Sequence, residues 1–193
     1  MENTLPKLVK MKARETHLKG CFVIEPRVIR DDRGYFYESF RKEDLEQTIG
    51  HQINFVQDNQ SSSSRGVLRG LHFQIGDHQQ ANLVRVAKGS VLDVCVDLRK
   101  DSDTFKQYFS MVLDDKDHKQ LFIPRGLAHG FLVLEDDTIF SYKCDNYYNK
   151  SFERGIIYND PELDIDWNIE DLPISLSDKD KNLPSLQSIL EWI

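Results

Sequence analysis

A histidine and an arginine interrupt an apolar stretch of the chain, "VLRGLHFQ" at residues 67–74. Polar groups in a buried segment need hydrogen-bonding partners or a ligand, because desolvating them unpaired costs free energy. Gln57 and Asn59, in the preceding segment "FVQDNQ", add further donors and acceptors. A lone histidine in a strand is more often structural. The polar residues in these two segments nevertheless favour a chemical role for His72 and for Arg69, which lies three residues before it.

Two further segments place acid, base or hydrogen-bonding groups next to turns. In "IPRGLAHGF", proline and glycines surround His129 at the start of a strand, where it either caps the loop or faces a site. In "IFSYKCDNYYNKSFERG", Tyr147 and Tyr148 are adjacent and point to opposite faces if the strand continues. At least one of these hydroxyl groups therefore meets solvent, a cavity or a polar partner.

These residues fall on short segments that are typical of an antiparallel β sandwich or barrel. Between residues 21 and 137 the segments are separated by Gly, Asp, Asn and Ser. The exception is "RKEDLEQTIG", which predicts a helix over residues 41–50 with Leu45 and Ile49 on one face and Gly50 as its stop. We therefore expect a rigid sheet to hold the candidate residues.

The alternation of apolar and polar side chains that is typical of a strand is clearest at residues 90–98, "SVLDVCVDL". The apolar side chains at its even positions face one way, whereas Asp93, Cys95 and Asp97 face the other. Two carboxylates predict that the second face meets water or a polar cavity. The stretch "SSSSRG" at residues 61–66 has the composition of a linker, but its place between two strand-like segments favours a strand connection.

The length of the chain predicts one domain spanning residues 1–193, because a chain of this size can bury a large core. We expect an N-terminal arm over about residues 1–20. The segment "LPSLQSILEWI" predicts a C-terminal helix over about residues 184–193. Its apolar face would pack on the barrel or on a partner chain. That face consists of Leu186, Ile189, Leu190 and Ile193.

Composition argues against several classes of protein. A formal charge of -7 opposes binding to nucleic acid. Cys21, Cys95 and Cys144 are widely spaced and odd in number, which indicates reduced thiols in a cytoplasmic protein rather than a disulfide framework. The chain contains neither a signal-like apolar segment near its start nor an apolar run long enough to span a membrane. We therefore expect neither secretion nor membrane insertion.

Several histidines in a small β-barrel raise the possibility of a metal site, because imidazoles with a carboxylate suit iron, zinc or copper. Cupin barrels often bind metal through two histidines separated by one residue, a following glutamate and a distant histidine. Here Gln74 stands at the partner position to His72, and no glutamate follows at a suitable spacing. Only His78 and His129 remain, so we expect no metal.

Taken together, the segments resemble the dTDP-4-dehydrorhamnose 3,5-epimerase family. The resemblance runs in order from about residue 11 to residue 184, with few gaps. It implies an all-β, antiparallel, cupin-like jelly roll (a double-stranded β-helix) with short peripheral helices. It also implies a homodimer that needs no cofactor and acts on a nucleotide-linked 4-keto-6-deoxy sugar in deoxysugar (rhamnose-like) and polysaccharide biosynthesis. The segments that carry it are "RDDRGYFYESF", "FVQDN", "VLRGLHFQ", "LVRVAKGSVLDVCVDLRKDSDTF", "LFIPRGLAHGFLVL", "YKCDNYY", "NDPELDIDW" and "LSDKD".

The resemblance implies three catalytic roles. The C4 ketone of such a sugar acidifies the hydrogens on C3 and C5, so inversion needs a base on one face, an acid on the other and stabilisation of the enolate. His72 matches the base, and Asp180 matches the carboxylate that orients it. Tyr142 matches the acid that returns the proton from the opposite face. A phenol suits this task if the site lowers its pKa.

The resemblance also implies a set of substrate-binding positions. Tyr148 matches the aromatic residue on which the nucleotide base stacks, with Tyr147 as a close alternative. Arg33, Arg69 and Lys179 would supply positive charge to the diphosphate, which explains how an acidic protein holds an anionic ligand. The remaining matched positions are Glu38, Gln57, Asn59, Asn82, His129 and Glu153.

One departure from the family pattern affects the chemistry. Asn82 stands where the family usually has a lysine close to the sugar, in "QQANLVR". Asparagine can donate a hydrogen bond but brings no charge, and losing one oxyanion donor commonly costs about 3 kcal/mol. Lys88 is a nearby lysine that could compensate. The absence of a proline after Trp167 has no evident chemical consequence.

The residues and the resemblance together predict an epimerase that inverts C3 and C5 of a nucleoside-diphosphate 4-keto-6-deoxyhexose, with dTDP as the expected nucleotide. Three alternatives remain open: an epimerase that inverts one centre, a 3,4-ketoisomerase, and a sugar-nucleotide binding protein that lost activity at Asn82. The presence of His72, Asp180 and Tyr142 argues against the binding protein, because a binder needs no base, orienter and opposed acid.

Overall fold

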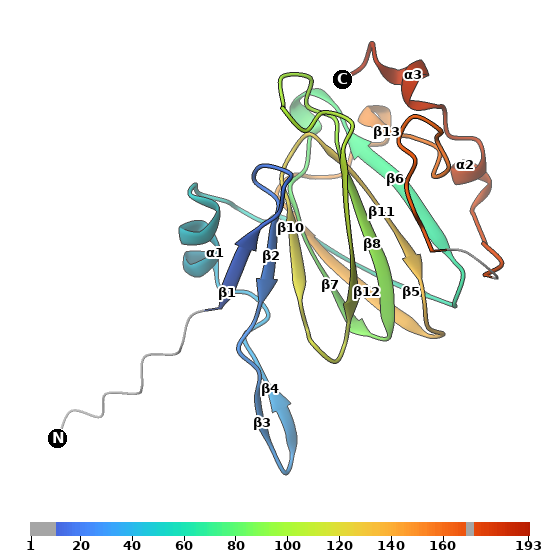
Figure 1. Cartoon of the computed structure of the whole chain (residues 1–193). Helices are drawn as coiled ribbons and strands as arrows, with labels where there is room; N and C mark the ends of the chain where they lie inside the picture. Colours follow the sequence, from blue (N-terminus) through green and yellow to red (C-terminus); the bar gives the residue numbers. More distant parts are fainter. Residues whose placement is uncertain (1–10, 169–171) are drawn as a thin grey trace.

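The computed structural model describes residues 11–168 and 172–193, which form two facing antiparallel β-sheets (Figure 1). The first sheet contains, in spatial order, β1 (Lys12–Glu15), β2 (Phe22–Glu25), β10 (Gln120–Ile123), β7 (Asn82–Lys88), β12 (Thr138–Cys144) and β5 (Gln57–Ser63). The second contains β13 (Glu153–Gly155), β6 (Leu68–Gln74), β11 (Leu127–Val133), β8 (Ser90–Asp97) and β9 (Tyr108–Asp114). The predicted all-β jelly roll with short peripheral helices is confirmed.

Apolar side chains form a core in three layers. One layer lies between the two sheets and includes Phe140. A second covers the outer face of the five-stranded sheet, where Trp167 and Leu186 pack from the C-terminal segment. The third lies on the outer face of the six-stranded sheet, under Leu45 of helix α1 (Lys42–Ile49). Because both sheets are backed by these layers, the side chains between them are held on a rigid support.

The predicted first helix is confirmed. Leu45 is buried, and Gly50 ends α1 in the left-handed conformation with φ of 79° while its amide donates to the carbonyl of Glu46. Glycine adopts this conformation without a Cβ clash, which explains the stop.

The predicted alternation of strand β8 holds, and of the two surroundings predicted for its second face, water and a polar cavity, water is wrong. All eight of its residues are buried, so the face that carries Asp93, Cys95 and Asp97 does not meet water. Cys95 joins the layer between the sheets. Asp97 accepts hydrogen bonds from Arg99, and Asp93 accepts one from a histidine described below. The carboxylates are tolerated because they have partners, as buried charges require.

The serine-rich stretch is part of a strand rather than only a connection. Strand β5 runs through Ser61, Ser62 and Ser63, which pair with β12. The chain turns only at residues 64–66. Serine is compatible with this edge strand because alternate side chains of β5 face the space between the sheets and the solvent, and none of them is fully buried.

The chain ends differ in part from the expectations. Residues 1–10 of the predicted N-terminal arm lie outside the described residues, and β1, which falls within the arm, pairs with β2. The C-terminal helix α3 spans only Leu186–Ile189. Leu190 and Ile193 still pack on the same apolar layer, so the predicted face was right and the helix length was wrong.

Two glycines let β6 and β11 approach closely where the candidate residues lie. A Cβ added to Gly130 would stand 2.8 Å from the carbonyl oxygen of Arg69. A Cβ added to Gly70 would stand 2.6 Å from the Cα of Gly130. Only glycine permits such an approach. The register of the two strands at this point places His72 opposite His129.

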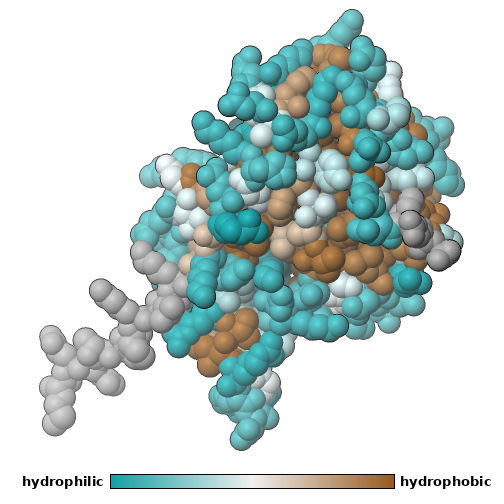
Figure 2. Space-filling model, viewed as in Figure 1, coloured by the Kyte–Doolittle hydropathy of each residue, from teal (hydrophilic) through white to brown (hydrophobic). Residues whose placement is uncertain are grey.

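A small hairpin projects from the body of the molecule. It consists of β3 (Ile29–Asp31) and β4 (Gly34–Phe36), and all six of its strand residues are exposed (Figure 1). Ile29 and Phe36 lie on it with exposed fractions of 44% and 63%. Apolar atoms gather on this hairpin in the space-filling view (Figure 2).

Candidate functional site

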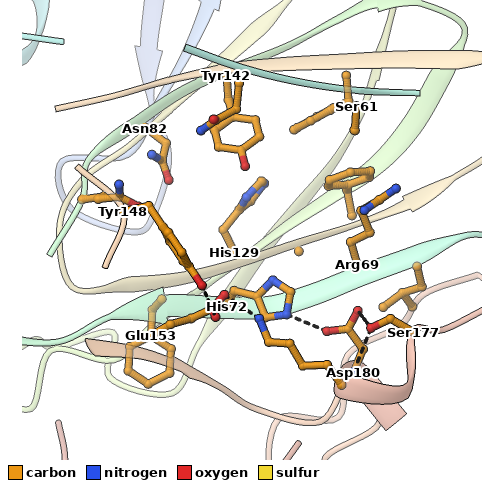
Figure 3. Close-up of a pocket in the computed structure, with 18 of the residues that line it drawn as sticks. Ser61, Arg69, His72, Asn82, His129, Tyr142, Tyr148, Glu153, Ser177 and Asp180 are labelled. Atoms are coloured by element: carbon orange, nitrogen blue, oxygen red, sulfur yellow. Dashed lines mark hydrogen bonds and ion pairs between the residues drawn. The ribbon is translucent and has the colours of Figure 1, made fainter. Parts of the chain in front are cut away.

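A large cavity opens between the two sheets and has a volume of about 740 Å³. Strands of both sheets contribute to its lining, and so does the short helix α2 (Asp178–Lys181) (Figure 3). Ten of the residues predicted from the sequence line it: Asn59, Arg69, His72, Asn82, His129, Tyr142, Tyr148, Glu153, Lys179 and Asp180. Segments more than one hundred residues apart in the chain therefore meet in one pocket.

His72 and Asp180 form a close pair. The Nε2 atom of His72 lies 2.6 Å from Oδ1 of Asp180. His72 retains 31% side-chain exposure toward the cavity, whereas Asp180 retains 5%. A carboxylate accepts hydrogen bonds only, so Nε2 carries the hydrogen and the lone pair of Nδ1 is left available. This is the tautomer that a histidine base requires.

Helix α2 fixes the position of Asp180. Ser177 caps the helix by accepting a hydrogen bond from the amide of Asp180, and its hydroxyl donates to Oδ2 at 2.8 Å. Burial raises the pKa of Asp180, but the hydrogen bonds from His72 and Ser177 outweigh burial and lower its pKa below the ordinary value. The orienting carboxylate therefore stays ionised at neutral pH.

Tyr142 faces the pocket from β12 of the opposite sheet. Burial raises the pKa of its phenol, with only partial opposition from Arg69 and Asn59. A lowered pKa, the condition under which a phenol is an effective acid, is therefore not met in this structure. A buried phenol stays protonated at neutral pH, and it therefore holds a proton that it can deliver.

A second histidine and carboxylate pair lies in the same pocket. Nε2 of His129 is 2.9 Å from Oδ2 of Asp93, which is completely buried. Sequence reasoning identified His129 but assigned Asp93 no role in the site. The signal was present in the alternation of residues 90–98, where a carboxylate occupies an otherwise apolar strand.

The loop that carries the tyrosines is held by one glutamine from each sheet. Oε1 of Gln57 accepts from the amide of Tyr148 at 3.0 Å. Oε1 of Gln74 accepts from the amide of Asn149 at 2.6 Å, and its Nε2 donates to the carbonyl of His78. Gln57 does not line the cavity, so its position is that of a support for the loop.

Tyr148 belongs to a polar chain along one wall of the pocket. Its hydroxyl donates to Glu153, whose other carboxylate oxygen pairs with Nζ of Lys179 at 2.5 Å. Burial raises the pKa of Glu153, but the contacts with Lys179 and Tyr148 lower it overall. Tyr147 is 64% exposed and does not line the cavity, which favours Tyr148 over Tyr147 for stacking.

Asn82 lines the cavity, but its amide hydrogens point to the backbone. Nδ2 lies 3.1 Å from the carbonyl oxygen of Ala81 and 3.5 Å from that of Lys143. Lys88 pairs with Asp137 at 3.8 Å and does not line the cavity. Compensation for the family lysine by Lys88 is therefore not supported.

Arg33 and Glu38 lie away from the cavity of their own chain. Arg33, at the turn of the β3–β4 hairpin, pairs with Asp31 and keeps 89% side-chain exposure. Glu38 pairs with Arg41 near the base of the hairpin. The structure thus brings ten of the fourteen predicted site residues into the cavity lining. Gln57 and Tyr147 lie just outside that lining, beside and on the loop that carries the tyrosines, and Arg33 and Glu38 lie elsewhere.

Within residues 11–168 and 172–193, no three His, Cys, Asp or Glu side chains converge as a metal-binding group. In the same part of the chain, no helix is long and apolar enough to cross a membrane. The absence of a metal from the reaction stays a prediction.

Known proteins resemble the chain over nearly its whole length. A family model described as dTDP-4-dehydrorhamnose 3,5-epimerase matches residues 15–188. The enzyme of that name from Methanothermobacter thermautotrophicus is 47% identical over 174 residues, which cover 90% of this chain and 93% of that protein. The crystal structure of the dTDP-4-dehydrorhamnose 3,5-epimerase from Elizabethkingia anophelis is 49% identical, with a TM-score of 0.89 over 93% of this chain and 98% of that one.

A further crystal structure contains a sugar nucleotide. The dTDP-6-deoxy-D-glucose-3,5-epimerase from Legionella pneumophila, in complex with dTDP-4-keto-L-rhamnose, is 43% identical with a TM-score of 0.89. The match covers 93% of this chain and 94% of the Legionella chain. Sequence and fold agree over the same residues that build the cavity, and on this ground the chain belongs to the dTDP-4-dehydrorhamnose 3,5-epimerase family.

Proposed function

We propose that this chain inverts C3 and C5 of a dTDP-linked 4-keto-6-deoxyhexose by successive enolisation. Membership of the family makes it an epimerase, an isomerase that acts on sugar nucleotides. The observation that carries the proposal is the pairing of His72 with a buried, ionised Asp180 in one cavity with Tyr142 of the opposite sheet. Substrate and product have the same oxidation state, so the scheme contains no redox cofactor.

In the first half of each inversion, Nδ1 of His72 removes the proton from the carbon next to the ketone. The C–H bond breaks, its electron pair moves into the bond toward C4, and the negative charge is carried by the C4 oxygen. Asp180 stabilises the imidazolium that results, because its charge is fixed close to Nε2 at 2.6 Å.

In the second half, Tyr142 gives its hydroxyl proton to the same carbon from the opposite face. The enolate electrons form the new C–H bond and the C4 ketone returns. Solvent then supplies a proton to Tyr142 and accepts one from His72. The cycle repeats at the other carbon, and no atom is gained or lost except hydrogens exchanged with water.

The nucleotide end of the substrate fits the wall formed by Tyr148, Glu153 and Lys179. An exposed aromatic ring offers a stacking surface for a base. Lys179 and Arg69 offer positive charge to a diphosphate, and both line the cavity. A net charge of -7 makes this local charge necessary for anion binding.

An epimerase that inverts a single centre is the second candidate. It is favoured by Asn82, whose amide hydrogens are directed to backbone carbonyls rather than to the cavity. A weaker stabilisation of the enolate would slow the harder of the two inversions most.

Exchange with heavy water tests the proposed function directly. We expect dTDP-4-keto-6-deoxyglucose incubated with the protein in deuterium oxide to gain deuterium at both C3 and C5, measured by proton NMR and mass spectrometry. Exchange at one centre would support the second candidate. Absence of exchange, with dTDP still bound, would overturn the enzymatic proposal.

Replacing His72 by Asn should abolish this exchange. Asparagine cannot accept a proton from carbon, and the substitution leaves Tyr148 and Lys179 in place, so we expect nearly unchanged affinity for dTDP by calorimetry. His51 is exposed and does not line the cavity, and His51→Gln is the matched control. Normal turnover in His72→Asn would refute the assignment of the base.

We also infer a homodimer in which the β3–β4 hairpin of each copy reaches the cavity of the other. Arg33 and Glu38 match substrate-binding positions of the family and yet lie outside the cavity of their own chain. The exposed apolar side chains of Ile29 and Phe36 supply surface for such a contact. The three free cysteines suit the cytoplasm, which remains our proposal for the location.

A further inference from the structure

The proposed mechanism requires Tyr142 to give up a proton, and its surroundings oppose that loss. Burial raises the pKa of this phenol, so the phenolate that remains after proton transfer is disfavoured in the cavity. An effective proton donor needs a neighbour that stabilises the phenolate. Such a neighbour must present an N–H or O–H group to the phenol oxygen.

Asn59 lies next to Tyr142 on the face of the six-stranded sheet that lines the cavity. The two residues are directly opposite in the antiparallel ladder between β5 and β12, so their side chains project from the same face. The side chain of Asn59 hydrogen-bonds to Tyr142 and opposes the effect of burial by lowering the pKa of the phenol. Only a donor favours an ionised phenol, so the amide nitrogen of Asn59 faces Tyr142.

A chain of hydrogen bonds determines which end of the Asn59 amide faces the phenol. The chain begins at the backbone amide of Tyr148, which can only donate and lies 3.0 Å from Oε1 of Gln57. The other end of the Gln57 side chain is therefore a donor, and its Nε2 lies 3.0 Å from Oδ1 of Asn59. With its oxygen turned to Gln57, Asn59 has its nitrogen on the far side, where it can donate.

Cys144 accepts a hydrogen bond at the end of this chain. Its sulfur lies 3.5 Å from Nδ2 of Asn59, and its position in the ladder is opposite Gln57. Burial raises the pKa of the thiol to about 12, so the sulfur is neutral at physiological pH. An amide nitrogen carries two hydrogens. One of them is held by Cys144, which leaves the other for the phenol of Tyr142.

The four side chains occupy two pairs of the same ladder, Gln57 with Cys144 and Asn59 with Tyr142. Strand pairing holds such side chains at fixed distances from one another. Cys144 is buried, and Gln57 and Asn59 are half-buried, so water competes little with their hydrogen bonds. Figure 3 shows the hydroxyl of Tyr142 directed into the pocket, toward the side on which His72 lies.

The other titratable and charged groups around the phenol come from four strands. Of these, Arg69 favours the phenolate, but it belongs to the part of the cavity that we assign to the diphosphate. The stabilisation of a phenolate beside the sugar therefore falls to Asn59. The groups are Arg69 on β6, His129 on β11, Glu153 on β13 and Cys144 on β12.

We propose that Asn59 is the positioning residue for the proton donor Tyr142: it holds the phenol in place and stabilises the phenolate that forms when the proton has been delivered. Gln57 and Cys144 keep the Asn59 amide in the required orientation. Because the chain of hydrogen bonds begins at Tyr148, it joins the loop that we assign to the nucleotide base to the group that acts on the sugar. The inference rests on the proposed function, in which Tyr142 returns the proton.

Fluorine NMR tests the effect of Asn59 on Tyr142 without any assay of activity. Incorporation of 3,5-difluorotyrosine at all seven tyrosines lowers the pKa of every phenol, because fluorine withdraws electrons, and the folded protein can then be titrated. Tyr142→Phe assigns the signal. We expect Asn59→Ala to lower the acid dissociation constant of the Tyr142 phenol by about tenfold, the usual effect of one hydrogen bond to a charged group. An unchanged constant would overturn the proposal.

Asp58→Ala is the matched control on the same strand. The side chain of Asp58 is 70% exposed, does not line the cavity and pairs with Lys143, so the variant removes a contact between the same two strands. Removal of a negative charge does not disfavour a phenolate, and we expect the dissociation constant of Tyr142 not to fall. A fall equal to that in Asn59→Ala would assign the effect to loosening of β5 and would contradict the proposal.

Gln57→Met tests the chain of hydrogen bonds, and it serves in place of Asn59→Ala if that variant does not fold. Methionine is close to glutamine in size but has no amide, so Asn59 loses its fixed orientation. We expect the dissociation constant of Tyr142 to fall in Gln57→Met. It should fall no further when Gln57→Met is added to Asn59→Ala, because both act through one hydrogen bond. Additive effects in the double variant would refute the chain.

Kinetics separate positioning from binding. In Asn59→Ala we expect kcat for exchange to fall by up to about tenfold, because proton transfer is only partial in the transition state, while dTDP affinity stays nearly unchanged. Loss of dTDP affinity with unchanged kcat and unchanged ionisation of Tyr142 would make Asn59 a binding residue only and overturn the proposal. No exchange in the unaltered protein would overturn the proposed function, while the titration would still decide whether Asn59 stabilises the phenolate.

Discussion

The carboxylate of Asp180 works because it is ionised, buried and fixed, and each property has a separate cause. Hydrogen bonds lower its pKa, the core buries it, and the cap of α2 fixes it. Asp180→Asn keeps the size of the side chain and removes its charge. We expect proton exchange to fall between about 10²- and 10⁴-fold, because the imidazolium of His72 loses its support. Exchange kinetics with dTDP affinity measured in parallel would check this.

Asp178 offers a matched control on the same helix. Its side chain is 98% exposed and does not line the cavity. Asp178→Asn changes the charge by the same amount and should leave exchange unchanged. Equal losses in both variants would mean that Asp180 acts through the general field of the helix and not through His72.

The raised pKa of Tyr142 predicts the alkaline behaviour of the rate. A proton donor is active below its pKa and is lost as pH rises through it. Because burial raises the pKa of Tyr142 above its ordinary value of 10.0, this group should cause no loss of kcat between about pH 7 and about pH 9.5. A pH profile of kcat measures this. A decline that begins well below the ordinary tyrosine range, with dTDP still bound, would contradict it.

At the scale of elements, the sequence pattern predicted correctly those helices and strands that are determined by interactions between residues close in the chain. The helix at residues 41–50 follows from its apolar face and from Gly50, whose left-handed conformation few other residues adopt. The β8 strand follows from its alternation. In contrast, the linker-like composition of the serine-rich stretch gave no sign that it continues as strand β5, because the pairing with β12 is a long-range interaction.

The candidate site was predictable in its residue types and not in its pairings. His72 and Asp180 were connected only by resemblance to a family, since 108 positions separate them in the chain. Asp93 and His129 are neighbours because β8 and β11 pair, which no spacing in the sequence reveals. The raised pKa of Tyr142 depends on burial, and burial in the lining of a cavity is a property of the folded molecule.

The close approach of β6 and β11 supplies a test of how the sheet positions the site. In Gly130→Ala the new methyl group would meet the carbonyl of Arg69, so we expect unfolding free energy to fall by about 1–3 kcal/mol and exchange to fall as His129 and His72 shift. Chemical denaturation and exchange kinetics measure the two effects.

Gly50→Ala is the control for Gly130→Ala, because it strains the backbone at a position away from the site. Nothing lies within 4 Å of a Cβ at this position, but φ of 79° is unfavourable for alanine. The variant should lose about 1–2 kcal/mol of stability and keep its exchange rate. If Gly130→Ala also kept its rate, the glycine would serve folding alone.

At the scale of the whole molecule, the projecting β3–β4 hairpin exposes large apolar side chains to solvent when the chain is alone. Phe36 is 63% exposed although the aromatic rings of Tyr35, Tyr37 and His118 pack together at its base. Exposed apolar groups with a positive residue at the tip suit a contact with a second copy whose cavity binds an anion. The proposed dimer thus explains both the exposed surface and the distance of Arg33 from its own cavity.

Co-expression of two inactive variants tests this arrangement. His72→Asn lacks the base, and Arg33→Ala lacks a predicted diphosphate contact, so each should be deficient alone at low substrate concentration. In a mixed dimer, one cavity would receive His72 from one chain and Arg33 from the other, and activity should return above that of either variant. If Arg33 served the cavity of its own chain, mixing would restore nothing. Phe36→Ser should weaken the dimer in sedimentation experiments, whereas Val112→Ser, at a site of 49% exposure on β9, should not.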